Sequence, residues 1–138
     1  MTADVTAEQI DELLRTAHDA RTRAYAPYSD FTVGSAVLAG GRIYSGCNVE
    51  NASYGLSICA ERVAATTAVA AGERRIDAVA VVGSSGRPTP PCGACRQVLN
   101  EFGPSMAVVV ETFDGVLREE WSLDAILPHA FGPDYLKE

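Results

Sequence analysis

One continuous apolar run, AVAVVG at residues 78–83, constrains the fold of this chain most strongly. An uninterrupted apolar run of this length is typical of a strand that is covered on both faces. An Ala-rich segment at residues 58–71 precedes it and closes on Gly72, which predicts a helix with a glycine stop. Because nearly every face of that helix is apolar, we expect it to be buried. A buried strand that follows a buried helix predicts an α/β fold.

The rest of the chain supplies further elements of both kinds. Thr6 and Gln9 resemble a capping box, and apolar residues at helical spacing predict an amphipathic helix over residues 7–24. The other predicted elements are strands at 31–39, 42–50, 106–111 and 115–121, with hairpin turns at Gly40-Gly41 and Asp114-Gly115, and helices at 92–103 and 122–127. Together they predict a three-layer α/β/α structure, a mixed sheet of about five strands with helices on both faces.

Length and charge restrict the class of protein. A chain of 138 residues fits a single domain, residues 1–138, that can bury a core without disulfides. The net charge of −7, from 11 basic and 18 acidic residues, argues against a polynucleotide partner, because polynucleotide binding relies on Lys and Arg. No apolar stretch approaches the ~18 residues of a membrane span, and the N-terminus lacks the pattern of a signal peptide. We therefore expect a cytoplasmic protein without a membrane partner.

Cysteines stand at the predicted starts of two helices. Cys59 and Cys92 each follow a loop and begin a helix, where unpaired N–H groups favour an anion and lower a thiol pKa. Cys95 lies three residues after Cys92, so both sulfur atoms project from the same side of one turn. By itself the Cys92–Cys95 pair could also be a redox dithiol or half of a structural zinc site. With Cys59 it supplies three thiolates, the ligands of a zinc site with an open fourth position.

Glu61 makes a catalytic zinc the favoured interpretation. It lies two residues from Cys59, which turns its carboxylate away from a ligand position but leaves it close enough to act on a water molecule at the metal. Zinc nucleobase deaminases have this arrangement: a Cys or His ligand, then x-Glu, and later Pro-Cys-x-x-Cys. The segments CAER and PCGAC, which begin at Cys59 and Pro91, match it. The sequence therefore predicts one Zn²⁺ per chain.

Five segments in order resemble the small homotetrameric cytidine deaminases of nucleoside salvage. They are YAPYSDFTVGSAVL, GCNVENASYG, CAER, PCGACRQVL and LPHAFGPDYL, and the similarity extends from about Tyr25 to Phe131, most of the chain. The resemblance implies a cytidine deaminase-like fold and zinc-dependent hydrolysis of cytidine and 2′-deoxycytidine at C4, with release of ammonia. Glu61 would take the proton of the water, deliver it to N3 and later protonate the leaving amino group.

The resemblance also assigns roles to residues around the metal. Asn48 and Glu50 match the pair that hydrogen-bonds the ribose hydroxyls, and Phe31 matches the aromatic residue that packs on the pyrimidine. Further matches are Ala60, whose N–H would donate to the pyrimidine O2, Arg62, which would hydrogen-bond the ligand sulfurs, and Phe131, which would reach the pocket of an adjacent subunit. These roles imply a homotetramer with shared active sites.

Three other functions compete with this interpretation. A related enzyme of the blasticidin-S deaminase type would use the same zinc centre on another aminopyrimidine nucleoside. A non-catalytic zinc-binding domain would not depend on Glu61, and a polynucleotide deaminase would need a more basic chain. We expect Cys47 to be a buried packing residue and assign no chemistry to His18 or His129.

Overall fold

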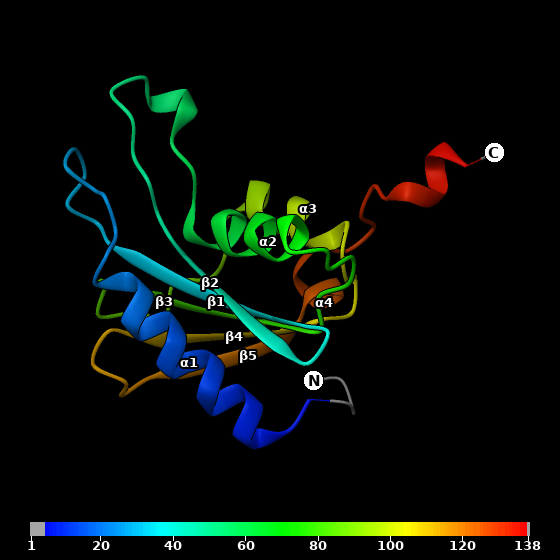
Figure 1. Ribbon diagram of the computed structural model, residues 1–138, viewed down its shortest axis with the longest axis horizontal. Coiled ribbons are helices and arrows are strands. Elements are labelled where there is room, and N and C mark those ends of the chain that lie inside the picture. Colours follow the sequence, from blue (N-terminus) through cyan, green and yellow to red (C-terminus); the bar gives the residue numbers. More distant parts are fainter. Residues whose placement is uncertain (1–4, 138) are drawn as a thin grey trace.

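The computed structural model describes residues 5–137, which form one mixed sheet with helices on both faces (Figure 1). The strand order is β2-β1-β3-β4-β5. The strands are β1 Val33–Ala39, β2 Arg42–Cys47, β3 Ala78–Gly83, β4 Ala107–Thr112 and β5 Arg118–Ser122. Strands β3 and β4 are parallel, and the other neighbouring pairs are antiparallel. The predicted mixed five-stranded sheet, with its first two strands joined as a hairpin, is thus confirmed.

Helix α1, Ala7–Arg21, covers one face of the sheet. It starts with the predicted capping box, in which Thr6 and Gln9 bond each other's backbone N–H groups. Its apolar side packs on β1, β3 and β4 through Leu13, Leu14 and Ala17. The helix ends at Arg21, where Thr22 is the C-cap, and not near residue 24 as predicted.

Helices α2, Ala60–Ala70, and α3, Gly93–Asn100, lie on the opposite face, as Figure 1 shows. This arrangement confirms the three predicted layers. The expectation that α2 is buried on nearly every face is wrong for the single chain. One side, which includes Ala64 and Ala68, is fully buried against the sheet, whereas Thr66, Thr67 and Ala70 are exposed. A helix on the outer surface of a sheet can bury only one side, even when it is rich in alanine.

Helix α2 lies unusually close to strand β2. A Cβ atom added to Gly46 would stand 2.4 Å from the backbone nitrogen of Ala64 and 2.7 Å from the carbonyl oxygen of Ala60. No real Cβ tolerates such distances to backbone atoms, so the glycine allows the two elements to touch. The contact fixes the first turn of α2, which carries Cys59 at its N-cap and Glu61.

Short elements complete the described chain. They are the 3₁₀ helices η1 Tyr54–Leu56 and η2 Pro133–Leu136, and helix α4 Leu123–Ile126 within the predicted range 122–127. The segment around η1 and the C-terminal segment both extend away from the sheet in Figure 1. None of the helices within residues 5–137 combines the length and the apolar character needed to cross a bilayer.

Candidate metal centre and its cavity

Three cysteine sulfur atoms converge between the starts of α2 and α3. Cys59 is the N-cap of α2 and Cys92 the N-cap of α3, where its sulfur accepts a hydrogen bond from the backbone N–H of Cys95. The Cys59 and Cys92 sulfurs lie 3.9 Å apart, and those of Cys92 and Cys95 3.3 Å apart. All three lie within 4.8 Å of one another, as ligands of a single ion must.

The electrostatics of the cluster favour a metal cation. A hydrogen bond from Cys95 and the Arg62 guanidinium lower the pKa of Cys59 to about 5, although burial opposes them. The same bond to Cys59 and its own burial raise the pKa of Cys95, which is fully buried. The Cys59 thiol therefore ionises readily, whereas the neighbouring Cys95 thiol keeps its proton. A soft divalent ion such as zinc would replace these protons, and three thiolates are a donor set that it prefers.

Arg62 lies directly beside the cluster, on the first turn of α2. Its Nη2 atom lies 3.7 Å from the Cys59 sulfur and donates to the carbonyl oxygen of Ser57 at 3.3 Å. Its guanidinium therefore offsets part of the negative charge that three thiolates would create. Its Nε atom is buried and has no hydrogen-bond partner among the described residues.

Glu61 is the buried acid of the site. Its side chain is 5% exposed, and this burial raises its carboxyl pKa to about 7. The cluster of potential metal ligands consists of Cys59, Cys92 and Cys95 and does not include the Glu61 carboxyl group. A carboxyl group that titrates near neutral pH can both accept and donate a proton there.

A cavity of about 220 Å³ adjoins the cysteine cluster and is lined by residues from several segments of the chain. The predicted residues that line it are Phe31, Asn48, Glu50, Cys59, Ala60, Glu61 and Cys92. Four lining residues were not predicted: Ser29, Val33, Thr89 and Pro90. Thr89 and Pro90 stand just before the Pro91-Cys92 motif, and their proximity to it is the one signal in the sequence that could have indicated them.

The polar end of the cavity is held by the segment before β1. Glu50 accepts hydrogen bonds from the backbone N–H groups of Tyr28 at 3.0 Å and Ser29 at 3.2 Å, and also from the Ser29 hydroxyl. The Ser29 hydroxyl bond lowers the Glu50 pKa, so the carboxylate stays ionised. Asn48 bonds the same segment, accepting from the Val33 N–H at 2.9 Å and donating to the Phe31 carbonyl at 2.8 Å.

Phe131 does not line the cavity of its own chain. Its ring is 56% exposed and stacks on Tyr135, with ring centroids 5.4 Å apart. Its backbone carbonyl accepts a hydrogen bond from Gln97 at 2.9 Å, which ties the C-terminal segment to α3.

The remaining residues without assigned chemistry lie elsewhere. Cys47 is half-buried rather than buried, because its sulfur points to the Arg23 carbonyl at 3.5 Å at the edge of the sheet. His18 on α1 bonds the buried Glu111 of β4 at 2.7 Å, a contact that sequence periodicity could not reveal. His129 is exposed, with a φ of 56°.

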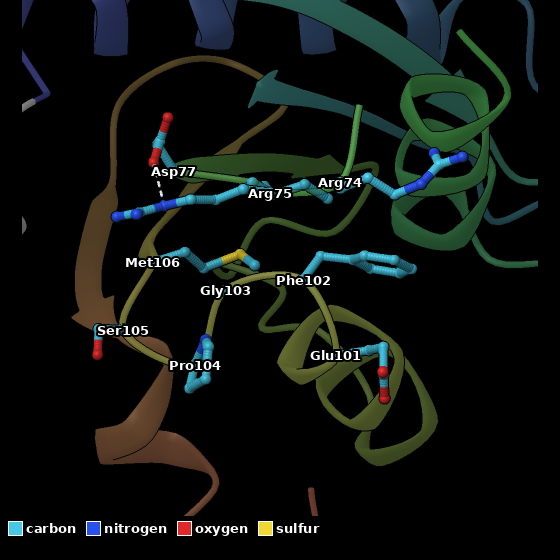
Figure 2. A pocket seen from close by; sticks show the side chains of 10 residues that line it. Arg74, Arg75, Asp77, Glu101, Phe102, Gly103, Pro104, Ser105 and Met106 are labelled. Atoms are coloured by element: carbon cyan, nitrogen blue, oxygen red, sulfur yellow. Dashed lines mark hydrogen bonds and ion pairs between the residues drawn. The ribbon is translucent and has the colours of Figure 1, made fainter. Parts of the chain in front are cut away.

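A larger cavity of about 350 Å³ lies at the N-terminal ends of the inner strands β3 and β4, between the segments that lead into them (Figure 2). Its arginines are already engaged. Arg75 pairs with Asp77 at 3.2 Å, and Arg74 turns toward α2 to bond the Val69 carbonyl at 3.0 Å. With Glu101 the lining charges cancel, and no cluster of three or more potential metal ligands lies there among the described residues. The metal centre is therefore the candidate active site.

Comparisons with known proteins agree with this site. The model of the family described as "Cytidine and deoxycytidylate deaminase zinc-binding region" matches residues 7–112. A cytidine deaminase of Sporosarcina psychrophila is 45% identical over 129 residues, which cover 92% of this chain and 94% of the relative. A cytidine deaminase of Mycobacterium tuberculosis is 45% identical over 121 residues, which cover 87% of each chain.

A solved structure shares the fold over nearly the whole chain. The crystal structure of cytidine deaminase from Burkholderia pseudomallei superimposes with a TM-score of 0.84 at 47% identity, covering 95% of this chain and 100% of the other. The likeness confirms the fold expected from the sequence.

Proposed function

Because this chain belongs to the cytidine and deoxycytidylate deaminase family, we propose that it hydrolyses cytidine and 2′-deoxycytidine to the uridine nucleosides and ammonia. The observation that carries the proposal is the position of Glu61, a buried carboxyl group with a raised pKa, in one cavity with two of the three clustered cysteines. A zinc-binding domain without catalysis has no need for an acid in that position.

Cys59, Cys92 and Cys95 would hold the zinc ion. When bound, zinc supplies Lewis-acid chemistry that makes a water molecule nucleophilic near neutral pH. Arg62 would stabilise the thiolate form of Cys59 and limit the negative charge of the site, a role that its 3.7 Å contact with that sulfur supports.

Glu61 would carry the protons of the reaction. It accepts a proton from the attacking water and delivers it to N3 of the pyrimidine while the water oxygen bonds to C4. It then accepts the remaining proton of the C4 hydroxyl and passes it to the amino group, so that the C4–N bond breaks and ammonia leaves. Its pKa near 7 suits both transfers, because neither protonation state is strongly disfavoured at neutral pH.

Four residues would bind and orient the nucleoside. The ionised Glu50 would accept hydrogen bonds from the ribose hydroxyls, and Asn48 would donate to them with the amide hydrogen that its bond to the Phe31 carbonyl leaves free. Phe31 would pack on the pyrimidine. Ala60, the first residue of α2, has an N–H without an intrahelical partner, which would donate to the pyrimidine O2.

Exposed apolar residues in two projecting segments support a homotetramer with shared active sites. Tyr54 and Leu56 around η1 are 74% and 66% exposed, and the C-terminal Phe131 and Leu136 are 56% and 76% exposed. Both segments extend away from the sheet in Figure 1. Side chains of this kind need a cover, and a second copy would provide one while Phe131 reaches a neighbouring cavity.

The cysteines also support the proposed cytoplasmic location. All four, Cys47, Cys59, Cys92 and Cys95, are free, although the Cys92 and Cys95 sulfurs are only 3.3 Å apart. Three of them must stay reduced to bind a metal ion, and a reducing compartment keeps them so.

Ammonia release from a panel of aminopyrimidine nucleosides, with zinc content measured on the same sample, tests the proposal. Cytidine and 2′-deoxycytidine should be the preferred substrates of a preparation that contains one zinc per chain. Preference for blasticidin S would assign the chain to the related enzyme type instead. A zinc-loaded preparation that deaminates no member of the panel would contradict the proposed function.

A further inference from the structure

Thr89 stands at the wall of the catalytic cavity in a space that a glycine leaves open. A Cβ atom added to Gly83, the last residue of β3, would lie 2.6 Å from the Thr89 hydroxyl oxygen and 3.0 Å from its Cβ atom. It would also lie 3.4 Å from the tip of the Phe31 ring. Thr89 and Phe31 both line the cavity. The absence of a side chain at Gly83 therefore leaves room for the Thr89 and Phe31 side chains at the wall of the cavity.

The backbone around Thr89 gives it little freedom to move. The residue lies in the segment Pro88-Thr89-Pro90-Pro91, and each proline fixes its own φ and restricts the residue before it. The side chain is β-branched, which restricts its χ1 angle. Its hydroxyl lies 3.4 Å from the carbonyl oxygen of Arg87, the residue just before this segment. A methyl-sized substituent on a ligand in the cavity could not displace it cheaply, whereas a Cβ atom on Gly83, at 2.6 Å from its hydroxyl oxygen, would force it to move.

The position of Thr89 relative to a bound pyrimidine follows from the groups that would hold the sugar at one end of the cavity and C4 at the other. N1 of the base carries the sugar, which Asn48 and Glu50 would bind, and C4 stands opposite N1, toward the cysteines. Glu61 and Ala60, at the start of α2, would face the N3 and O2 edge. The other edge, with C5 and C6, would then face the wall that Thr89 and Pro90 form before Cys92.

We propose that Thr89 is a specificity-determining residue, which limits the size of the substituent that the enzyme accepts at C5 of the pyrimidine. This inference rests on the proposed function, because it assumes that cytidine occupies the cavity. The relevant measurement is the ratio of kcat/KM for 5-methylcytidine to kcat/KM for cytidine. A residue that only supports the fold would change both constants together and leave the ratio unchanged.

Two substitutions should move the ratio in opposite directions. Thr89→Ala removes the hydroxyl and the methyl group from the wall and should raise the ratio about tenfold, the lower end of the range for one methyl-sized change in a pocket. Gly83→Ala should push Thr89 into the cavity and lower the ratio by about the same factor. The double variant should return toward the wild-type ratio, because the hydroxyl at 2.6 Å is then absent.

Two further variants serve as controls. Thr89→Val keeps the shape of the side chain and should leave the ratio within about twofold of wild type, if size rather than hydrogen bonding decides. Gly86 lies in the loop between Gly83 and Thr89, but a Cβ added there meets no atom within 4 Å, so Gly86→Ala should leave both constants unchanged. Should Gly83→Ala fail to fold, Thr89→Ala decides alone, since it only removes atoms.

The outcomes separate this inference from the proposed function. A wild-type protein that binds zinc but deaminates neither nucleoside contradicts the proposed function, and the inference with it. A wild type that is active on cytidine, combined with an unchanged ratio in Thr89→Ala, overturns the inference alone. A ratio that shifts equally in Thr89→Val and Thr89→Ala also overturns it, because the hydroxyl and not the size would then be responsible.

Discussion

The sulfur atoms of Cys59 and Cys92 lie 3.9 Å apart although 33 positions separate the two residues in the chain. Each is the N-cap of a different helix, so the first turns of α2 and α3 point their free N–H groups at the same place. Two helix N-termini stabilise negative charge, which favours thiolates over thiols at this point. The contact thus couples the packing of two helices to the binding of one ion.

We expect one zinc ion per chain, lost when a ligand is removed. Cys92→Ala should abolish both zinc binding and turnover, because two thiolates cannot replace three. Cys47→Ala is the matched control, since this fourth cysteine lies outside the cluster and should be dispensable for zinc. Elemental analysis of both variants checks the prediction, and full activity of a metal-free preparation would end the zinc hypothesis.

Glu61→Gln should separate metal binding from catalysis. Glutamine keeps the size of the side chain but cannot accept and return a proton, so turnover should fall by about 10²- to 10⁴-fold or more while zinc is retained. Glu101→Gln, at an exposed position beside the cavity at the N-terminal ends of β3 and β4, should change neither. A loss of less than about tenfold in Glu61→Gln would favour a non-catalytic zinc domain.

Burial of Glu61 predicts a pH-dependent stability of the metal-free protein. The folded carboxyl has a pKa of about 7 against an ordinary value of 4.5, so it favours folding at low pH and this contribution is lost as the pH rises through 7. Glu61→Gln cannot ionise. Relative to wild type, it should therefore gain more at pH 8 than at pH 5, on the order of 2 kcal/mol in the free energy of unfolding. Chemical denaturation of the chelator-treated proteins measures this, and an equal gain at both pH values would contradict it.

Arg62 should tune the metal site without being a ligand. Arg62→Ala removes the cation that lies 3.7 Å from the Cys59 sulfur, and should weaken zinc binding or turnover by about 10- to 100-fold. Arg62→Lys keeps the charge but not the planar guanidinium, so it should recover part of the loss. Competition with a chromogenic chelator reports the zinc affinity, and an Arg62→Ala protein with unchanged affinity and turnover would refute this role.

The C-terminal segment should support assembly and activity together. Truncation after Leu127 leaves all three cysteines and Glu61 intact but removes Phe131 and the exposed apolar residues after it. The truncated protein should form weaker oligomers and show lower activity at the same zinc content. Sedimentation at the assay concentration tests this, and an intact protein that is fully active as a monomer would refute the shared-site proposal while leaving the zinc chemistry unaffected.

The elements of the fold and the metal cluster could be predicted because their signals are local. The apolar run at 78–83 is strand β3, and the caps Cys59 and Cys92 follow from the loop-to-helix transitions beside them. Thr6 and Gln9 likewise form their capping box within one turn. The expectation of one domain over residues 1–138 stays a prediction.

Contacts between distant segments could not be predicted. The half-exposed surface of α2 depends on which side meets the sheet, and composition does not encode that side. The bonds that Glu50 accepts from Tyr28 and Ser29 could not be predicted either, because they join residues more than 20 positions apart in the chain. The place of Thr89 at the cavity could not be predicted for the same reason, since it depends on contact with a glycine six residues earlier.

The contact at Gly46 makes the metal centre sensitive to a residue that does not line its cavity. A methyl group there would strike the backbone of α2 at 2.4 Å and push the helix outward, carrying Cys59 and Glu61 away from Cys92 and Cys95. In a survey of random substitutions, Gly46 would therefore group with the cysteines as a loss-of-function position. The chemistry of this protein thus depends on the absence of a side chain in strand β2, against the first turns of α2.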